Sequence, residues 1–507
     1  MRADVAKSSL SGVAQFVIST LLVLITIPVF VRLLGAEAYG VFSLVALVGT
    51  VNIFANLGLN SSLIRFLAQQ GKSRESDYDI VVNLLILLTV LSPLTMCGIV
   101  FRTFILVHVL SVPSHLLNDS TWLFISMLVG NVFLLVGQTF TAILDSQQKI
   151  YLTNLYQVIN SIIYWGLILL VLSLGYSLGG VAVAILASTL IWFCIVVASG
   201  LQSWGRISFE GLSSNGMRVA KKQLHYGLQI YTGGLVSFLY EPITKILVSR
   251  FLGVTEVGLF DIGLRARNQI MSLATKLLYP LYPIISKLDD PKKIRTLVHD
   301  IEQKILLLVM PLIGIVLLAA KPLVLLFFHS NVDAIAITIA CIVSAFLFGS
   351  FTVTPHYQFL MAKGHASKTI ILQVVNVLVN AIVFLVCHPW LGYYAVVAAN
   401  AVAILTSCGL SLYYQNRYLD SLIFDSAQQM VAVGVSFSVA LALGYFFSTL
   451  FDVNVWKLIS GPMIVMCAIV ILYRYFGLLN AADISRYIGE RTIFSKLFVR
   501  VLCKSQS

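Results

Sequence analysis

Long, uninterrupted apolar stretches dominate this chain of 507 residues. They lie at 8–31, 40–64, 79–101, 121–144, 151–174 and 178–200, and then at 224–249, 256–284, 298–320, 332–360, 368–388, 391–415, 426–450 and 455–476. Stretches of about 20 residues cross the ~30 Å hydrocarbon core of a bilayer as helices. Only 11% of the residues are charged and the mean hydropathy is +0.94, which excludes an ordinary soluble protein with about 25% charged residues. We therefore predict an all-α polytopic membrane protein with about fourteen transmembrane helices.

The net charge of +12 arises mainly in the loops on one side of the predicted membrane. Twenty-three lysine and arginine residues lie in loops on the side of the N-terminus. The opposite side holds five, namely Arg32, Arg102, Arg250, Lys321 and Lys457. This asymmetry predicts that both termini are cytoplasmic. We interpret the inner basic residues as topology signals and contacts to membrane lipids, and we expect no nucleic-acid partner.

The seven cysteines are scattered, without a Cys-x-x-C spacing or a histidine at ligand spacing. We therefore expect neither structural disulfides nor a metal site. The sequence indicates no cofactor, and its loops are too short to hold a soluble domain. The function is accordingly expected to reside in the helical bundle.

An internal repeat organises the chain. The stretch "RLLGAEAYGVF" begins at Arg32, and "RFLGVTEVGLF" begins 218 positions later at Arg250. "LGYSLGGVAVA" from Leu174 similarly matches "LGYYAVVAANA" from Leu391. We predict two parallel six-helix repeats, which have the same orientation because six is even, followed by two added helices. The expected parts are 1–200, a cytoplasmic linker at 201–223, 224–415, the added helices at 426–476 and a basic cytoplasmic tail at 477–507.

Polar stripes on the first two helices of each repeat predict a shared cavity. A charged side chain facing lipid costs about 2.5–3.5 kcal/mol on insertion scales, so such residues face protein or water. The expected polar lining is Gln15, Ser19, Asn52, Asn56, Asn60, Gln229, Ser237 and Gln269; the expected cations are Arg65, Lys245, Arg265 and Lys276; and Glu241 and Asp261 are candidates for ion coupling.

The charged residues also have a structural interpretation. Glu241 and Lys245 are four residues apart, as are Asp261 and Arg265, so each pair could neutralise itself within one helix. Lys276 has no acidic residue within one turn. The sequence leaves both interpretations open for the two pairs and favours a functional role for Lys276.

The segments "FVRLLGAEAYGVFSL", "NLGLNSSLIRFLA", "LVSRFLGVTEVGLFDIGLR" and "LYPLYPIISKL" resemble the lipid-linked oligosaccharide flippases of bacterial O-antigen and polysaccharide export. These belong to a superfamily that also contains multidrug and toxin extruders. The resemblance implies two six-helix lobes in a V-shaped arrangement in the bacterial inner membrane. Two positions depart from the family: Asn56 stands where an acidic residue is common, and Asp261 where a small or hydroxyl residue is expected.

The resemblance also implies a function in lipopolysaccharide or exopolysaccharide synthesis. An oligosaccharide on undecaprenyl pyrophosphate would pass from the cytoplasmic to the periplasmic leaflet by alternating access. The cavity cations would hold the pyrophosphate and the polar residues the sugars. A polysaccharide polymerase and the chain-length machinery are the implied protein partners.

Two other functions are compatible with parts of the sequence. A multidrug extruder would share the repeat, but the excess of basic residues in the expected cavity disfavours binding of organic cations. A membrane glycan polymerase would usually carry a large extramembrane loop, whereas the segment 102–119 is short and its His108 and His115 are expected to be surface residues. We therefore predict a transporter and not an enzyme.

Overall fold

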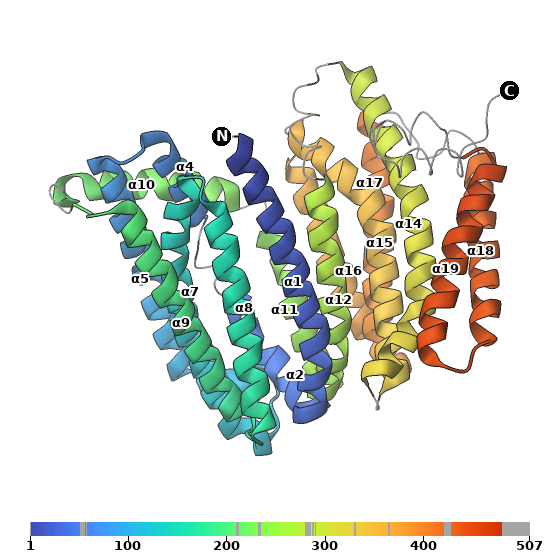
Figure 1. Ribbon diagram of the computed structural model, residues 1–507, viewed down its shortest axis with the longest axis horizontal. Coiled ribbons are helices and arrows are strands. Elements are labelled where there is room, and N and C mark those ends of the chain that lie inside the picture. The colour runs from blue at the N-terminus through green and yellow to red at the C-terminus, as the bar shows by residue number, and fades with distance from the viewer. Residues whose placement is uncertain are drawn as a thin grey trace. The chain divides into compact units, whose positions relative to one another are not determined.

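A computed structural model describes residues 2–50, 56, 58–208, 212–231, 235–278, 285, 288, 290–328, 331–363, 366–419 and 427–478. Helices form the secondary structure of these described residues, and no strand occurs among them. The predicted all-α class is therefore confirmed. The chain divides into two compact units, Met1–Asp261 and Ile262–Ser507. Figure 1 labels the helices in chain order from blue to red.

Unit 1 is built on long helices with shorter pieces between them. Its elements are α1 (Arg2–Leu34), α2 (Ala36–Val45), η1 (Ala46–Thr50), α4 (Leu59–Gln70), α5 (Arg74–Val100), α6 (Arg102–Phe104), η2 (Ile105–Val109), η3 (Ser114–Leu116), α7 (Leu117–Ser146), α8 (Ile150–Ser173), α9 (Leu178–Trp204), α10 (Leu212–Tyr231), α11 (Leu235–Phe251) and the start of α12 (Val254–Leu278). Helix α7 packs along α9, and α8 packs against both α1 and α9. Ser73 caps α5 by accepting a hydrogen bond from the backbone N–H of Ser76, as a serine at a helix start commonly does.

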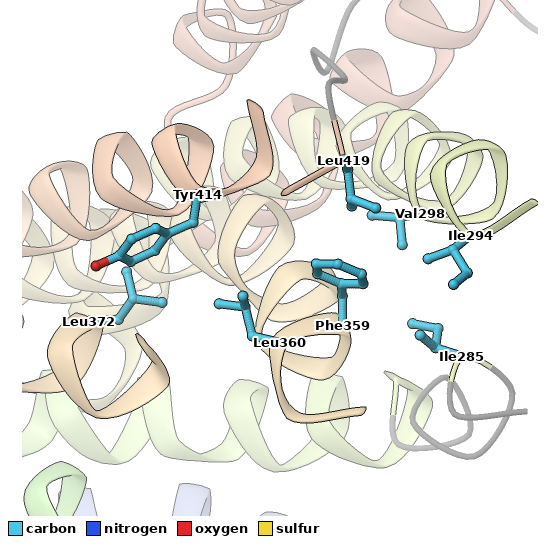
Figure 2. Close-up of a cluster of buried hydrophobic side chains, with 8 residues drawn as sticks. All are labelled: Ile285, Ile294, Val298, Phe359, Leu360, Leu372, Tyr414 and Leu419. Atoms are coloured by element: carbon cyan, nitrogen blue, oxygen red, sulfur yellow. The ribbon is translucent and has the colours of Figure 1, made fainter. Parts of the chain in front are cut away.

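Unit 2 begins inside α12, and its described residues continue through six long helices. These are α14 (Pro291–Phe327), α15 (Val332–Ala362), α16 (Ala366–Leu391), α17 (Tyr394–Leu419), α18 (Ala427–Thr449) and α19 (Asn454–Tyr475). Asp290 caps α14, and Pro291 occupies its first turn, where a proline costs no hydrogen bond. An apolar cluster at one end of this unit joins α14, α15, α16 and α17 (Figure 2). Helices α18 and α19 pack on each other and on α14.

Eleven helices of the described residues are long and apolar enough to span a membrane. They coincide with eleven of the predicted spans. The other three predicted spans, at 40–64, 224–249 and 256–284, each include residues outside the described part of the chain. Most of the described residues of the first lie in α2, η1 and α4, with Gly58 in the left-handed region at a φ of 72°.

Several predicted cytoplasmic loops of unit 1 lie at one end of it. Lys72, after α4, donates to the backbone carbonyl of Arg206, after α9, at 2.7 Å. Lys149, after α7, donates to Ser203 at 2.6 Å. These contacts agree with loops on a common side of the membrane, while the cytoplasmic position of the termini stays a prediction.

The same end depends on a buried aspartate. Asp77 of α5 accepts hydrogen bonds from Trp204 Nε1 at 2.7 Å and from the backbone N–H of Ser208 at 3.0 Å. We expect Asp77→Ala to lower the free energy of unfolding by about 3 kcal/mol, because buried donors lose their acceptor. Chemical unfolding in detergent, followed by tryptophan fluorescence, measures this loss.

Glu75, two residues earlier, provides the control. It contacts Arg218 at 3.4 Å, and both side chains are more than half exposed. Glu75→Ala should change the free energy of unfolding by less than about 1 kcal/mol, as exposed ion pairs contribute little. Equal losses in the two variants would contradict the structural role of Asp77.

Candidate functional site

The two copies of the repeated motif contact each other inside unit 1. A methyl group added to Gly40 of α2 would lie 1.7 Å from the carbonyl oxygen of Val254 in α12. A methyl group added to Gly258 of α12 would lie 2.8 Å from the carbonyl oxygen of Ala36 in α2. Ala36 and Val254 are 218 positions apart, and so are Gly40 and Gly258. Equivalent residues of the two copies therefore make reciprocal contacts, which we call the glycine crossing.

The glycine crossing explains why the motif needs glycine at this position. Small residues allow two helices to approach until their backbones touch. The nearest atoms at Gly40 belong to backbone and not to a side chain that could turn away. The repeated glycine therefore encodes a close helix contact between the two copies.

A buried group of charges lies beside the glycine crossing. Lys245 Nζ of α11 is 2.6 Å from Asp261 Oδ1 of α12 and 2.7 Å from Glu241 Oε1. The hydroxyl of Tyr39, from α2, donates to the other oxygen of Asp261 at 2.6 Å. The side chains of Lys245 and Asp261 are only 3% and 2% exposed, whereas Glu241 is 31% exposed. We call these four residues the charge cluster; it joins three helices that carry the two motif copies.

The segment 102–116 packs beside the same helices. Ser249 of α11 is buried, and its hydroxyl group donates a hydrogen bond to the backbone carbonyl of Leu110. His115 Nε2 lies 3.4 Å from Glu37 Oε2 at the start of α2, with both side chains exposed. This segment therefore contacts Glu37 in the first motif copy and Ser249, the residue just before the second copy, at the end of the helices that the sequence places outside the cell.

Three groups of predicted site residues are brought together by the structure. Glu241 and Lys245 form the expected pair within one helix, and Lys245 also binds Asp261, a partner that we did not predict for it. Since two carboxylates hold Lys245, the structure favours the structural interpretation of this lysine. Gln15 donates to Ser19 at 3.5 Å, within one face of α1.

The asparagines of the broken second helix also cluster. The backbone N–H of Asn60 donates to Asn56 Oδ1 at 3.2 Å, and Asn60 Nδ2 donates to Gln138 Oε1 of α7 at 2.7 Å. Arg65 lies further along α4 with an exposed side chain, and Arg265 and Gln269 of α12 are half-buried. Four predicted residues, or their side chains, lie outside the described residues: Asn52, Gln229, Ser237 and Lys276.

Sequence reasoning did not single out Tyr39 or Gln138. Tyr39 lies inside the first motif copy, but its equivalent in the second copy is Val257, so the repeat gave no indication of its hydrogen bond. Asp261 and Lys245 are sixteen residues apart on different helices, which is beyond the spacing of neighbours on one helix. Contacts between helices were needed to find both.

Comparisons with known proteins place this chain in a family. Residues 5–289, more than half of the chain, match the family described as "Polysaccharide biosynthesis protein". A search of curated proteins finds no match.

Solved structures show a shared fold at low sequence identity. A lipid II flippase MurJ in an inward closed conformation is 14% identical with a TM-score of 0.71, covering 92% of this chain and 98% of that one. An inward-facing multidrug resistance MATE transporter of the MOP superfamily is 17% identical with a TM-score of 0.64, covering 80% and 96%. A Vibrio cholerae MATE transporter is 13% identical with a TM-score of 0.54, covering 82% and 99%. The predicted superfamily resemblance is thereby confirmed at the level of the fold.

Proposed function

Since this chain belongs to the polysaccharide biosynthesis protein family, we propose that it is a flippase for undecaprenyl-pyrophosphate-linked oligosaccharide, the unit of an O-antigen or exopolysaccharide. Lipid-linked sugar enters from the cytoplasmic leaflet of the bacterial inner membrane and leaves in the periplasmic leaflet. The lipid tail stays in the bilayer, so the protein has to provide a path only for the charged and sugar parts. The polar second, seventh and eighth helices suit such a path.

The glycine crossing is the observation that carries this proposal. Alternating access in a repeat transporter requires the two repeats to move against each other around a site. Because the two backbone contacts of the glycine crossing are reciprocal, they can form and break together, and they can therefore close one side of the transport path. The crossing lies between the loops expected outside the cell, so we assign it to closing the periplasmic side.

The charge cluster supports the closed contact. Tyr39 from one copy binds Asp261 from the other, and Lys245 neutralises Asp261 where water is scarce. A polar network is stable in such a place only when its members are satisfied together. Opening of the crossing therefore requires Tyr39 to leave Asp261.

Arg265 and Lys276 remain the proposed contacts of the pyrophosphate. Lys245 is held by two carboxylates, and the side chain of Arg65 in the middle of α4 is exposed, so neither is needed for this role. Arginine binds phosphate through two parallel hydrogen bonds, and lysine binds it as a point charge. Asn56, Asn60, Gln15 and Ser19 are the proposed contacts of the sugars.

Substitution of the two cations tests this assignment. Arg265→Ala and Lys276→Ala should each abolish glycan export, and Arg265→Lys should retain part of it, because a point charge still attracts phosphate. Surface glycan in cells that lack their own flippase is the measurement, with protein abundance determined in parallel. Full rescue of Arg265→Ala by Asp261→Asn would show that Arg265 serves only to neutralise Asp261.

The multidrug extruder is the alternative within the same fold. It predicts that cells producing the protein resist organic cations and export no additional glycan. Resistance without glycan export would refute the proposed substrate.

A further inference from the structure

Unit 2 contains a buried acid–histidine pair that the proposed path does not use. Glu302 Oε1 of α14 lies 2.8 Å from His356 Nδ1 of α15, and the two side chains are 1% and 0% exposed. Gln415 of α17 donates from Nε2 to the other carboxylate oxygen of Glu302 at 2.6 Å. Three helices therefore meet at one carboxylate.

Apolar side chains enclose this pair from both directions along the helices. Val298 lies one turn before Glu302 on α14, and Phe359 and Leu360 lie one turn after His356 on α15; all three belong to the apolar cluster of Figure 2. A second apolar cluster begins on the other side, with Val309 of α14 as one of its members. Charge in such surroundings is costly unless it is paired.

The pair can exchange one proton with a definite change of charge. With Glu302 ionised and His356 protonated, the two charges cancel. Release of the imidazolium proton to water leaves a neutral imidazole and a buried carboxylate with a net charge of −1, and uptake reverses this step. Because burial disfavours that uncompensated charge, the deprotonated pair favours a conformation in which water reaches it.

Other charged or titratable groups lie near the pair along the chain, including Asp300 and Lys304, two residues before and after Glu302 on α14. Gln415 faces the pair from α17. His299 of α14 contacts Gln303, and Lys363, just after α15, donates to the carbonyl of Leu288. Lys368 of α16 lies over the ring of Tyr414, and Arg417 of α17 donates to Tyr413. The described contacts of Glu302 therefore come from His356 and Gln415.

We propose that Glu302 and His356 form a proton-binding site that couples proton uptake and release to the separation of α14, α15 and α17. Imidazole changes charge near neutral pH more readily than other side chains do, and membrane transporters use carboxylate and histidine groups for proton transfer. Pro355 precedes His356 and lies inside α15, where a proline interrupts the hydrogen-bond ladder and provides a place for the helix to bend. Only the link to glycan transport rests on the proposed function; the proton site stands without it.

Cys408 reports on this separation. It is a buried cysteine of α17, and its sulfur would lie 3.6 Å from a methyl group added to Gly349 of α15. The full chain with Cys408 as its sole cysteine is placed in lipid nanodiscs and alkylated with a maleimide at pH 5.5 and 7.5. Each rate is divided by the rate of the denatured protein at the same pH, which removes the titration of the thiol.

If the proton site exists, the normalised alkylation rate of Cys408 should be about tenfold higher at pH 7.5 than at pH 5.5. Glu302→Gln and His356→Gln should each remove this pH dependence. The two variants are tested separately, so that the test remains possible if only one of them folds. His299→Gln changes another histidine of the same region and should keep it. A pH-independent rate in the unsubstituted protein, persistence of the dependence in Glu302→Gln or His356→Gln, or its equal loss in His299→Gln would overturn the proposal.

Glycan export by the same proteins separates this inference from the proposed function. Export with a pH-independent Cys408 rate would leave the flippase and remove the proton site. A pH-dependent rate that requires Glu302 and His356, in a protein that exports no glycan, would do the reverse.

Discussion

Gly40→Ala is expected to abolish most glycan export while the protein remains in the membrane at normal abundance. The added methyl group would lie 1.7 Å from the carbonyl oxygen of Val254, so α2 and α12 have to move apart. Overpacking of this kind costs about 1–3 kcal/mol. A cost of that size shifts a two-state equilibrium by about 5–150-fold, here away from the closed glycine crossing. Surface glycan and membrane abundance, measured in the same flippase-deficient cells, check the prediction.

Gly166→Ala is the matched control. Gly166 lies in α8, and a methyl group there meets no atom within 4 Å. Alanine is also the better helix former, by about 1 kcal/mol. Export should therefore stay at the unsubstituted level. Equal loss in Gly40→Ala and Gly166→Ala would show that the close approach at the crossing is irrelevant to transport.

Lys245→Met is expected to destabilise unit 1 strongly. The substitution keeps an unbranched side chain but leaves the carboxylates of Asp261 and Glu241 without their shared ammonium group. Removal of one partner from a buried ion pair costs about 3–5 kcal/mol. Unfolding in detergent should occur at a clearly lower denaturant concentration, and membrane abundance should fall several-fold.

Lys245→Met combined with Asp261→Asn should recover much of this stability. The amide oxygen that Asp261→Asn introduces can still accept the hydrogen bond that Tyr39 donates. The substitution also removes the negative charge of Asp261, the more buried of the two carboxylates that contact Lys245. Lys321→Met is the control, since Lys321 pairs with Asp333 at 2.8 Å but both side chains are more than 60% exposed, where pairs contribute less than about 1 kcal/mol. Failure of the double substitution to recover any stability would contradict the pairing of Lys245 with Asp261.

The apolar helices were predictable because their signal is local. The stretches 121–144 and 178–200 became the candidate spans Ser114–Ser146 and Leu178–Trp204, since about 20 consecutive apolar residues determine a spanning helix without knowledge of its neighbours. The described residues of the span expected at 40–64 do not form one continuous α-helix. Its asparagines and Gly58 interrupt the apolar stretch, and the left-handed backbone at Gly58 ends the helical path there.

The candidate site was predictable only where its partners share a helix. The pair of Glu241 and Lys245 follows from their spacing, whereas Lys245 with Asp261, Tyr39 with Asp261, and Glu302 with His356 each join different helices. Such contacts depend on the register of helix packing, which an apolar sequence leaves open. The repeat marked the residues of the glycine crossing, since both partners carry the same motif, but the sequence did not predict that they contact each other.

Transfer of lipid-linked sugar across a bilayer by the purified protein tests the central claim most directly. Liposomes containing undecaprenyl-pyrophosphate-linked oligosaccharide are prepared with the protein, with the Gly40→Ala variant and without protein, and an impermeant glycosidase is added outside. We predict that the unsubstituted protein makes nearly all of the oligosaccharide accessible to the enzyme, while the variant and the empty liposomes expose only the outer-leaflet fraction. Cleavage that stops at the outer-leaflet fraction in all three preparations would contradict the account.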